Sequence, residues 1–223
     1  MAATLRDSLS PSKLARVVRD AFWPFPSGLD PAHICCAILL RIVAAECEIR
    51  RSGQSTLDPL QIDTVHRLNA EISAAMNQFQ WAVTNRGLWE LLAEADESQA
   101  QILLFSVLEP LCIQRGIDVR REVETGRGPV DYRFLVRSGV SSVMELKLAK
   151  HRRLMDGLLA QTPIYMDAEQ ISEGHLGVIL QEDSERQRVD EVVKRSIDPD
   201  FANTRRIQVH VIDVRRPVSA SKA

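Results

Sequence analysis

The sequence predicts an α/β protein in which a mixed sheet, covered by helices on both faces, follows an all-helical N-terminal region. Three observations support this prediction. The first 95 residues carry apolar positions at helical spacing and no strand pattern. Two runs rich in Val, Tyr, Phe and Leu flank the turn Ser138-Gly139, which is typical of a β-hairpin. From residue 96 onward, helical stretches alternate with apolar strands, which favours a mixed sheet.

A chain of 223 residues suits one compact domain, or a smaller core with an appendage. We divide it into a helical N-terminal region (1–95), a core (96–215) and a flexible tail (216–223). The formal net charge is only −2, so no global basic field indicates a polyanionic partner. However, residues 115–153 contain ten Lys and Arg against five Asp and Glu, a local basic excess that is compatible with phosphate binding.

In the N-terminal region, Asp30-Pro31 and Asp58-Pro59 each resemble an N-cap followed by proline at the first helical position. The apolar run Ile34–Ala45 is too short to span a bilayer and contains Arg41, so it indicates a buried helix and no membrane association. The first residues lack the pattern of a secretory signal. The cysteines show no metal-ligand spacing, which favours buried free thiols and a reducing, cytoplasmic compartment. These cysteines are Cys35, Cys36, Cys47 and Cys112.

In the core, the predicted order of elements is helix, three strands, helix, strand, helix, strand. Before the core, a further helix is expected to cover Trp81–Ala95. The predicted core elements are helix Glu97–Gln114, strand Ile117–Glu124, the hairpin Gly126–Lys147, helix Lys150–Ile171, strand His175–Gln181, helix Ser184–Ser196 and strand Arg206–Arg215.

Alternation along the hairpin separates its side chains into two faces. Tyr132 and Phe134 share one face, with Met144 and Leu146 from the second strand. Asp131, Glu145 and Lys147 share the other face. Two carboxylates and an ammonium on one small surface can hold a divalent ion beside a phosphodiester. The alternative is an exposed cross-strand salt bridge, which contributes little to stability.

These residues resemble the PD-(D/E)XK nuclease superfamily, the restriction-endonuclease-like fold. The pattern is Pro129-Val130-Asp131, thirteen residues, then Glu145-Leu146-Lys147. One residue separates the proline from the aspartate, a departure that leaves the metal carboxylate in place. The resemblance covers roughly residues 95–215 and implies an αβββαβ core. It also implies Mg²⁺ or Mn²⁺ on Asp131 and Glu145, with Lys147 positioning water or stabilising charge.

Two further parts of the resemblance lie on the flanking helices. Gln161 and Tyr165 match the Q-x-x-x-Y motif of the exonuclease-type branch, which implies that they help place the nucleic-acid strand. Pro163 within that motif is expected to bend the helix or restart it at Thr162. The family often takes one more acid from the first core helix, and Glu97 is the candidate. Solvated polar positions are the alternative for all three residues.

Four basic residues near this site are candidate phosphate contacts, although a solvated charged face is an equal alternative. They are Arg127, Lys150, Arg152 and Arg153. His175 and His210 lie in predicted strands, which favours structural histidines over metal ligands. Trp23, Trp81 and Trp89 at helical positions favour a core role over base stacking.

The sequence therefore predicts a metal-dependent nuclease acting on nucleic acid, with DNA favoured over RNA from family prevalence alone. A nuclease fold that only binds, as a scaffold subunit, is the alternative. The N-terminal region is a candidate surface for homodimerisation or partner docking. A small nuclease with such an extension suggests, by analogy of architecture, an antiviral-defence or mobile-element role.

Overall fold

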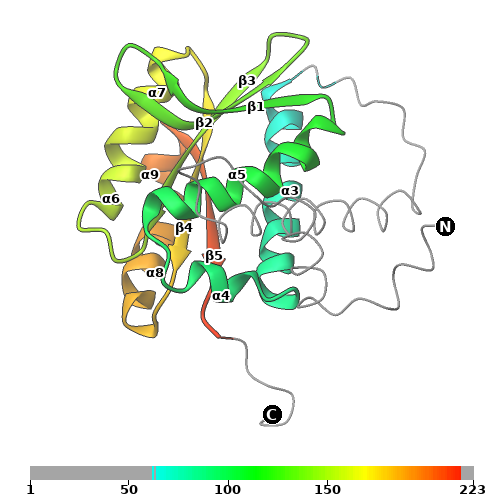
Figure 1. The fold of residues 1–223 in the computed structure, drawn as a ribbon. Coiled ribbons are helices and arrows are strands. Elements are labelled where there is room, and N and C mark those ends of the chain that lie inside the picture. Colours follow the sequence, from blue (N-terminus) through cyan, green and yellow to red (C-terminus); the bar gives the residue numbers. More distant parts are fainter. Residues whose placement is uncertain (1–61, 63, 217–223) are drawn as a thin grey trace, which may run out of the picture.

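The computed structural model describes Ile62 and residues 64–216 (Figure 1). The helix starts predicted at Asp30 and Asp58, and the apolar run Ile34–Ala45, lie outside the described residues. The described helices are α3 (Val65–Asn85), α4 (Leu88–Leu92), α5 (Glu97–Ile113), α6 (Leu154–Asp156), α7 (Thr162–Ala168), α8 (Arg186–Ser196) and α9 (Pro199–Ala202), with a π-helical turn η1 (Gly157–Gln161) and a 3₁₀ turn η2 (Asp183–Glu185). The strands are β1 (Ile117–Glu124), β2 (Pro129–Val136), β3 (Ser141–Leu148), β4 (Glu173–Leu180) and β5 (Arg206–Asp213).

The five strands form one mixed sheet in the order β1-β2-β3-β4-β5. The first three strands form an antiparallel meander, whereas β4 runs parallel to β3 and β5 runs parallel to β4. Each parallel pair needs a crossover, and helices supply both of them. This arrangement confirms the α/β class with a mixed sheet that the sequence predicted.

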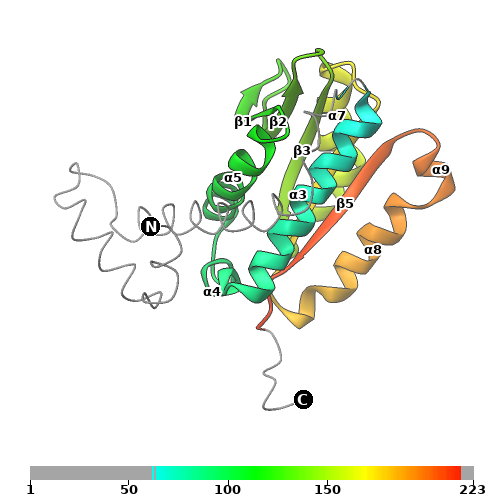
Figure 2. The same ribbon diagram turned by 90° about the vertical axis from the view of Figure 1, so that its right-hand side faces the viewer.

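Helices cover both faces of the sheet (Figures 1 and 2). Leu68 and Ile72 of α3 and Leu104 of α5 pack against one face in a single core. Leu158 in η1, Met166 of α7 and Val189 of α8 pack against the other face. Since the central strand β3 meets helices on both sides, all eight of its residues are buried. The described residues before position 96 thus share a core with the sheet.

The strand predictions agree closely with the structure. Residues 117–124 form β1 as predicted, and the predicted hairpin forms β2 and β3 around Ser138-Gly139. Gly139 adopts a φ of 86°, the left-handed conformation that glycine tolerates best, and its N–H donates to the carbonyl of Val136 at 2.9 Å. The observed β4 and β5 overlap the predicted strands, with small differences at their ends.

Several helix boundaries differ from the predictions. The helix containing Leu68 and Ile72 begins at Val65, because the side chain of Thr64 caps it by accepting from Arg67 N–H. The stretch predicted as one helix over 81–95 is divided, since Gly87 adopts a φ of 75° between α3 and α4. Helix α8 begins at Arg186, after the short turn η2, rather than at Ser184.

The predicted continuous helix over 150–171 is wrong. Residues 149–153 form a turn, and the helical segment then changes from α6 through the π-helical turn η1 to α7. Pro163 has no N–H and cannot bond the carbonyl four residues earlier, so the chain around it departs from regular α-helical bonding. The α-helix restarts at Thr162, whose hydroxyl donates to the Gly157 carbonyl at 2.8 Å.

Of the four cysteines, only Cys112 lies within the described residues, and there it is buried and free, as predicted. Burial raises the pKa of its thiol to about 12. Over the part of the chain that the structure describes, every helix is too short or too polar to cross a bilayer.

Candidate functional site

The hairpin brings two carboxylates to the end of its paired region. The pairing of β2 with β3 ends at Tyr132 and Met144, and Asp131 and Glu145 are the next residues beyond that pair. Their neighbours Tyr132 and Met144 are fully buried in the core on the α3 and α5 side. Glu145 is 3% exposed. Val143 lies in the core on the opposite face, which agrees with the face predicted for Glu145 and Lys147, whereas Asp131 contacts α5.

Asp131 is held by a hydrogen bond at each oxygen. One oxygen accepts from the Gln101 side-chain amide at 2.7 Å, and the other accepts from the Leu146 backbone N–H at 2.7 Å. The Tyr132 hydroxyl donates to the Gln101 carbonyl at 2.7 Å, which fixes that turn of α5 against β2. These contacts set the orientation of the Asp131 carboxylate.

Lys147 lies between two carboxylates that come from different elements. Its ammonium is 2.9 Å from an oxygen of Glu145 on the same strand and 2.9 Å from an oxygen of Glu97 on α5. Glu97 occupies the first turn of α5, which the capping box of Asp96 and Gln99 starts at that residue. The structure thus brings Glu97, Asp131, Glu145 and Lys147 into one group.

The charges in this group do not balance, because three carboxylates meet one ammonium. Burial, and then the nearby Glu145 carboxylate, raise the pKa of Asp131 from 3.8 to about 7. Burial also raises the pKa of Glu145, an effect that the Lys147 ammonium opposes. Burial alone lowers the pKa of Lys147, but the two glutamates outweigh burial and raise it. Lys147 therefore remains a cation, and the carboxylates favour further positive charge.

Three side-chain oxygen atoms of the predicted site residues are buried and have no hydrogen-bond partner. They are Glu97 Oε2, Glu145 Oε2 and Gln161 Oε1. A buried acceptor without a partner costs roughly 1–3 kcal/mol, so such atoms in a folded protein usually meet water or an ion. Oxygen is also the donor that Mg²⁺ and Mn²⁺ prefer.

These residues suit a divalent ion because they supply oxygen donors, although they do not form a preformed metal site. Among Ile62 and residues 64–216, no three His, Cys, Asp or Glu side chains are already arranged around one point to hold a metal. Mg²⁺ needs only one or two protein carboxylates and keeps several waters. Glu145 and Glu97 each offer an oxygen with no partner, and Asp131 offers the remaining lone pairs of a fixed carboxylate.

Gln161 and Tyr165 come from the segment that covers the other face of the sheet. Gln161 is the last residue of η1, and Tyr165 lies on α7 with 8% of its surface exposed. Burial raises the pKa of the Tyr165 hydroxyl, and the charges of Glu145 and Asp131 raise it further. The phenol therefore lies within electrostatic reach of both carboxylates.

The four predicted phosphate-binding residues are all exposed. Arg127 lies between β1 and β2, two residues before the strand that carries Asp131. Lys150, Arg152 and Arg153 follow the strand that carries Glu145 and Lys147. Arg153 pairs with Asp156 at 2.6 Å, whereas the other three make no hydrogen bond or ion pair with described residues. In the chain, these residues lie directly before and after the hairpin strands that carry the site.

Sequence reasoning did not assign a role to Gln101. Gln101 lies four residues after Glu97 and therefore on the same face of α5. This spacing is the feature of the sequence that could have indicated a place near the site. Its contact with Asp131 depends on how α5 docks against β2, which the spacing alone does not determine.

The fold and the site define an α/β protein with an acidic, lysine-containing group on a central hairpin. A family model described as "Domain of unknown function (DUF8371)" matches residues 68–183, slightly more than half of the chain, and the chain belongs to this family. The matched residues include Glu97, Asp131, Glu145, Lys147, Gln161 and Tyr165. Neither a curated protein nor a solved structure matches the chain.

Proposed function

We propose that this protein is a metal-dependent nuclease of the PD-(D/E)XK type, which hydrolyses phosphodiester bonds in DNA. The observation that carries the proposal is the pairing of Lys147 with both Glu97 and Glu145 near Asp131, in which two buried glutamate oxygens lack partners. A purely structural ion pair needs only one carboxylate for the ammonium.

The order of elements supports the proposal. From α5 onward the chain forms a helix, an antiparallel three-stranded meander, a helical crossover and a strand parallel to β3. This is the αβββαβ order that the sequence resemblance implies. The carboxylates come from the second and third strands of the meander, and the additional acid comes from the first core helix.

In the proposed mechanism, Asp131, Glu145 and Glu97 would hold the metal through their oxygens. When bound, a divalent ion polarises the phosphate and lowers the pKa of water. The raised pKa of Lys147 means that it acts as a fixed cation rather than as a base, so its ammonium neutralises charge developing on the phosphate. Gln161 and Tyr165 position the strand, and Arg127, Lys150, Arg152 and Arg153 contact the flanking phosphates.

Cleavage by the purified full chain tests this proposal. Plasmid DNA, single-stranded DNA and single-stranded RNA are incubated with the wild-type protein and Mg²⁺ or Mn²⁺, with EDTA as the metal-free control. Asp131→Asn and Lys147→Met should each abolish cleavage, whereas Asp118→Asn on the exposed side of β1 should leave it unchanged. Undiminished cleavage by both site variants would exclude these residues as the catalytic site. Cleavage of RNA alone would mean that the substrate is RNA and not DNA.

One observation favours a second candidate, a nuclease fold that only binds as a scaffold subunit. The Lys147 ammonium already partners two carboxylates, and no preformed three-residue metal cage exists among the described residues. Calorimetric titration with Mn²⁺ separates the two candidates. Binding that is lost in Glu145→Gln supports the enzyme, and its absence from the wild type supports the scaffold.

A further inference from the structure

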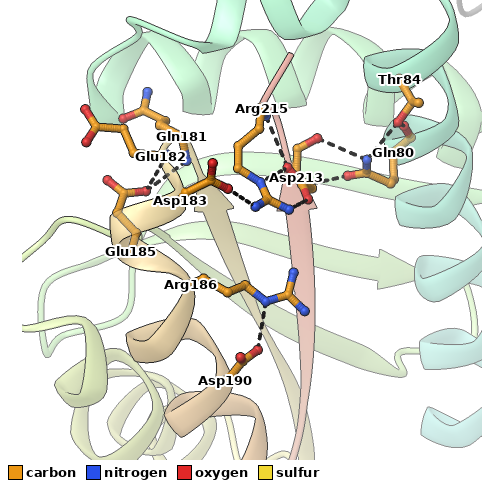
Figure 3. Close-up of polar contacts among 10 residues, drawn as sticks. All are labelled: Gln80, Thr84, Gln181, Glu182, Asp183, Glu185, Arg186, Asp190, Asp213 and Arg215. Carbon is orange, nitrogen blue, oxygen red and sulfur yellow. Dashed lines mark hydrogen bonds and ion pairs between the residues drawn. The ribbon is translucent and has the colours of Figure 1, made fainter. Parts of the chain in front are cut away.

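The free edge of β5 is closed at one end by a side chain that replaces a neighbouring strand. β5 is the last strand of the sheet, so no strand formed by Ile62 or residues 64–216 pairs with one of its two edges. At Asp213, however, the side chain of Gln80 from α3 bonds both backbone groups on that edge (Figure 3). Its carboxamide oxygen accepts from Asp213 N–H at 2.9 Å, and its amide donates to the Asp213 carbonyl at 3.2 Å. The edge therefore accepts an amide group in the geometry of a paired strand.

Further along this edge, other backbone groups point outward in the same way as those of Asp213, but no described side chain bonds them. Backbone groups alternate in direction along a strand, so Ile207, Val209 and Val211 point their N–H and C=O groups the same way as Asp213. Within the described part of the chain, none of these outward groups is hydrogen-bonded. Edge strands of soluble proteins are usually protected, and this edge lacks proline, lysine or a bulge along those five residues.

A cavity lies beside this edge. It has a volume of about 570 Å³, within the range of ligand pockets, and its floor includes Ile207 and Gln208 of β5. Figure 2 shows α3 on one side of β5 and α9 on the other. The wall from α3 includes small side chains at its centre, and the opposite wall includes Ala202 of α9. The α3 wall residues are His66, Asn69, Ala70, Ser73, Ala74 and Asn77. We refer to this cavity, with the open edge Ile207–Val211, as the β5 slot.

We infer that the β5 slot binds an extended peptide segment of a partner protein, which adds to the sheet as a sixth strand. Main-chain hydrogen bonds to an exposed edge are a general mode of peptide recognition. Five residues of β5 span about 16 Å, enough for four or five residues of an added strand. The small residues on α3 leave room for the side chains of that strand.

The helices beside β5 favour a single extended segment over a second copy of β5 as the occupant. α3 and α9 lie on either side of β5 (Figure 2), so a second copy would have to bring its own flanking helices close to these two before the strands could pair at roughly 4.8 Å.

Charge at one end of the slot specifies part of the partner's chemistry. His66 and Arg206 line the slot at the N-terminal end of β5. The Arg206 side chain is 75% exposed and makes one 3.2 Å contact, with Glu173. The segment is therefore expected to carry small or β-branched side chains toward α3 and an acidic side chain at the end beside Arg206.

Selection from a phage-displayed library of random ten-residue peptides on the full chain tests this inference. Enriched peptides should bind the wild type and slow hydrogen exchange at the amides of Val209 and Val211. Val209→Pro removes an outward N–H without removing a bond to β4, and Ala74→Trp fills the slot from α3. Each should weaken binding by about tenfold or more. Glu90→Trp, on α4 away from the slot, is the matched control and should bind normally.

Three outcomes would overturn the inference. The first is a selection that yields no binding peptide, and the second is a set of peptides that bind Val209→Pro and Ala74→Trp as tightly as the wild type. The third is slow exchange of the Val209 and Val211 amides in the free full chain. That result would mean that residues of the chain itself, or a second copy, already cover the edge. Because none of these measurements uses nuclease activity, the inference stands or falls independently of the proposed function.

Discussion

The ammonium of Lys147 lies 2.9 Å from a carboxylate oxygen of Glu97, a residue fifty positions earlier in the chain. This contact joins the first core helix to the third strand of the sheet. Lys147 therefore neutralises the two glutamates that, in the proposed function, would also hold a divalent ion through their other oxygens. Lysine and a bound metal would then compete for the negative charge of the same two carboxylates, which leads to a measurable prediction.

Replacing Lys147 by methionine should destabilise the metal-free protein and increase its response to metal. The change leaves the buried Glu145 and the partly exposed Glu97 without their cation, and a buried pair that loses one partner costs roughly 3 kcal/mol. A divalent ion then has no competitor, so Mn²⁺ should raise the melting temperature more in the variant than in the wild type. Thermal unfolding with EDTA and with Mn²⁺ measures both effects.

Lys150→Met is the control for this experiment, because it removes an exposed lysine three residues away that makes no described ion pair. Its stability and its response to Mn²⁺ should match those of the wild type. An equal Mn²⁺ response in Lys147→Met and the wild type would mean that lysine and metal do not share these carboxylates.

Gln101→Met should weaken metal binding more than it weakens the fold. The variant keeps the length of the side chain but loses the donor to Asp131, whose carboxylate then rotates more freely. We expect a stability loss of about 1 kcal/mol, and a loss of Mn²⁺ affinity of at least tenfold, as is typical when a partner that orients a ligand is removed. Urea unfolding and calorimetry measure the two quantities, with Ser106→Ala on the exposed side of α5 as the control. Unchanged Mn²⁺ affinity would show that Gln101 only supports the fold.

The hairpin site could be predicted from the sequence because strand alternation fixes which side chains share a face. Once Tyr132 and Phe134 were assigned to the core, alternation assigned Asp131 to the other side, and Glu145 and Lys147 followed from the second strand. Glu97 was indicated by the family resemblance, which implies an acid on the first core helix.

Contacts that depend on the docking of elements could not be predicted in the same way. The bond from Gln101 to Asp131 and the pairing of Gln80 with Asp213 both join a helix to a strand, and neither leaves a periodic pattern. The turn η1 was also missed, because a π-helical turn differs from an α-helix only in which carbonyl each N–H meets. Pro163 indicated a bend there but not its form.

Pro163→Ala should lower activity with little change in stability. An N–H at position 163 allows regular α-helical bonding, which would rewind η1 and turn Gln161 away from its present direction. Cleavage should fall by about tenfold, since small displacements of positioning groups have effects of this size. Ile164→Ala, an exposed position on the same helix, is the control. Activity equal to the wild type would indicate that the π-helical turn does not position Gln161.

The buried histidines of β4 and β5 should make stability fall with acid. His175 donates its Nε2–H to the side-chain oxygen of Asn69 at 2.8 Å, its Nδ1 lies 2.9 Å from Nε2 of His210, and both rings are buried. Burial, and then the neighbouring His210, lower the pKa of His175 well below 6.5, and burial lowers the pKa of His210 to about 4. Below pH 6.5 the unfolded chain binds more protons at these sites than the folded chain does. Stability is therefore lost as the pH falls from about 6.5 toward 4.

Acidic groups act in the opposite direction over part of this range. The raised pKa of Asp131, about 7, makes the folded chain bind more protons between pH 7 and 4, which adds stability as the pH falls. The histidine contribution is thus measured as a difference between the wild type and His210→Leu in urea unfolding at pH 7 and pH 5. The wild type should lose about 2 kcal/mol more than the variant over this interval. His151→Leu, at an exposed position, should behave as the wild type, and equal losses in the wild type and His210→Leu would show that His210 is protonated in the folded protein.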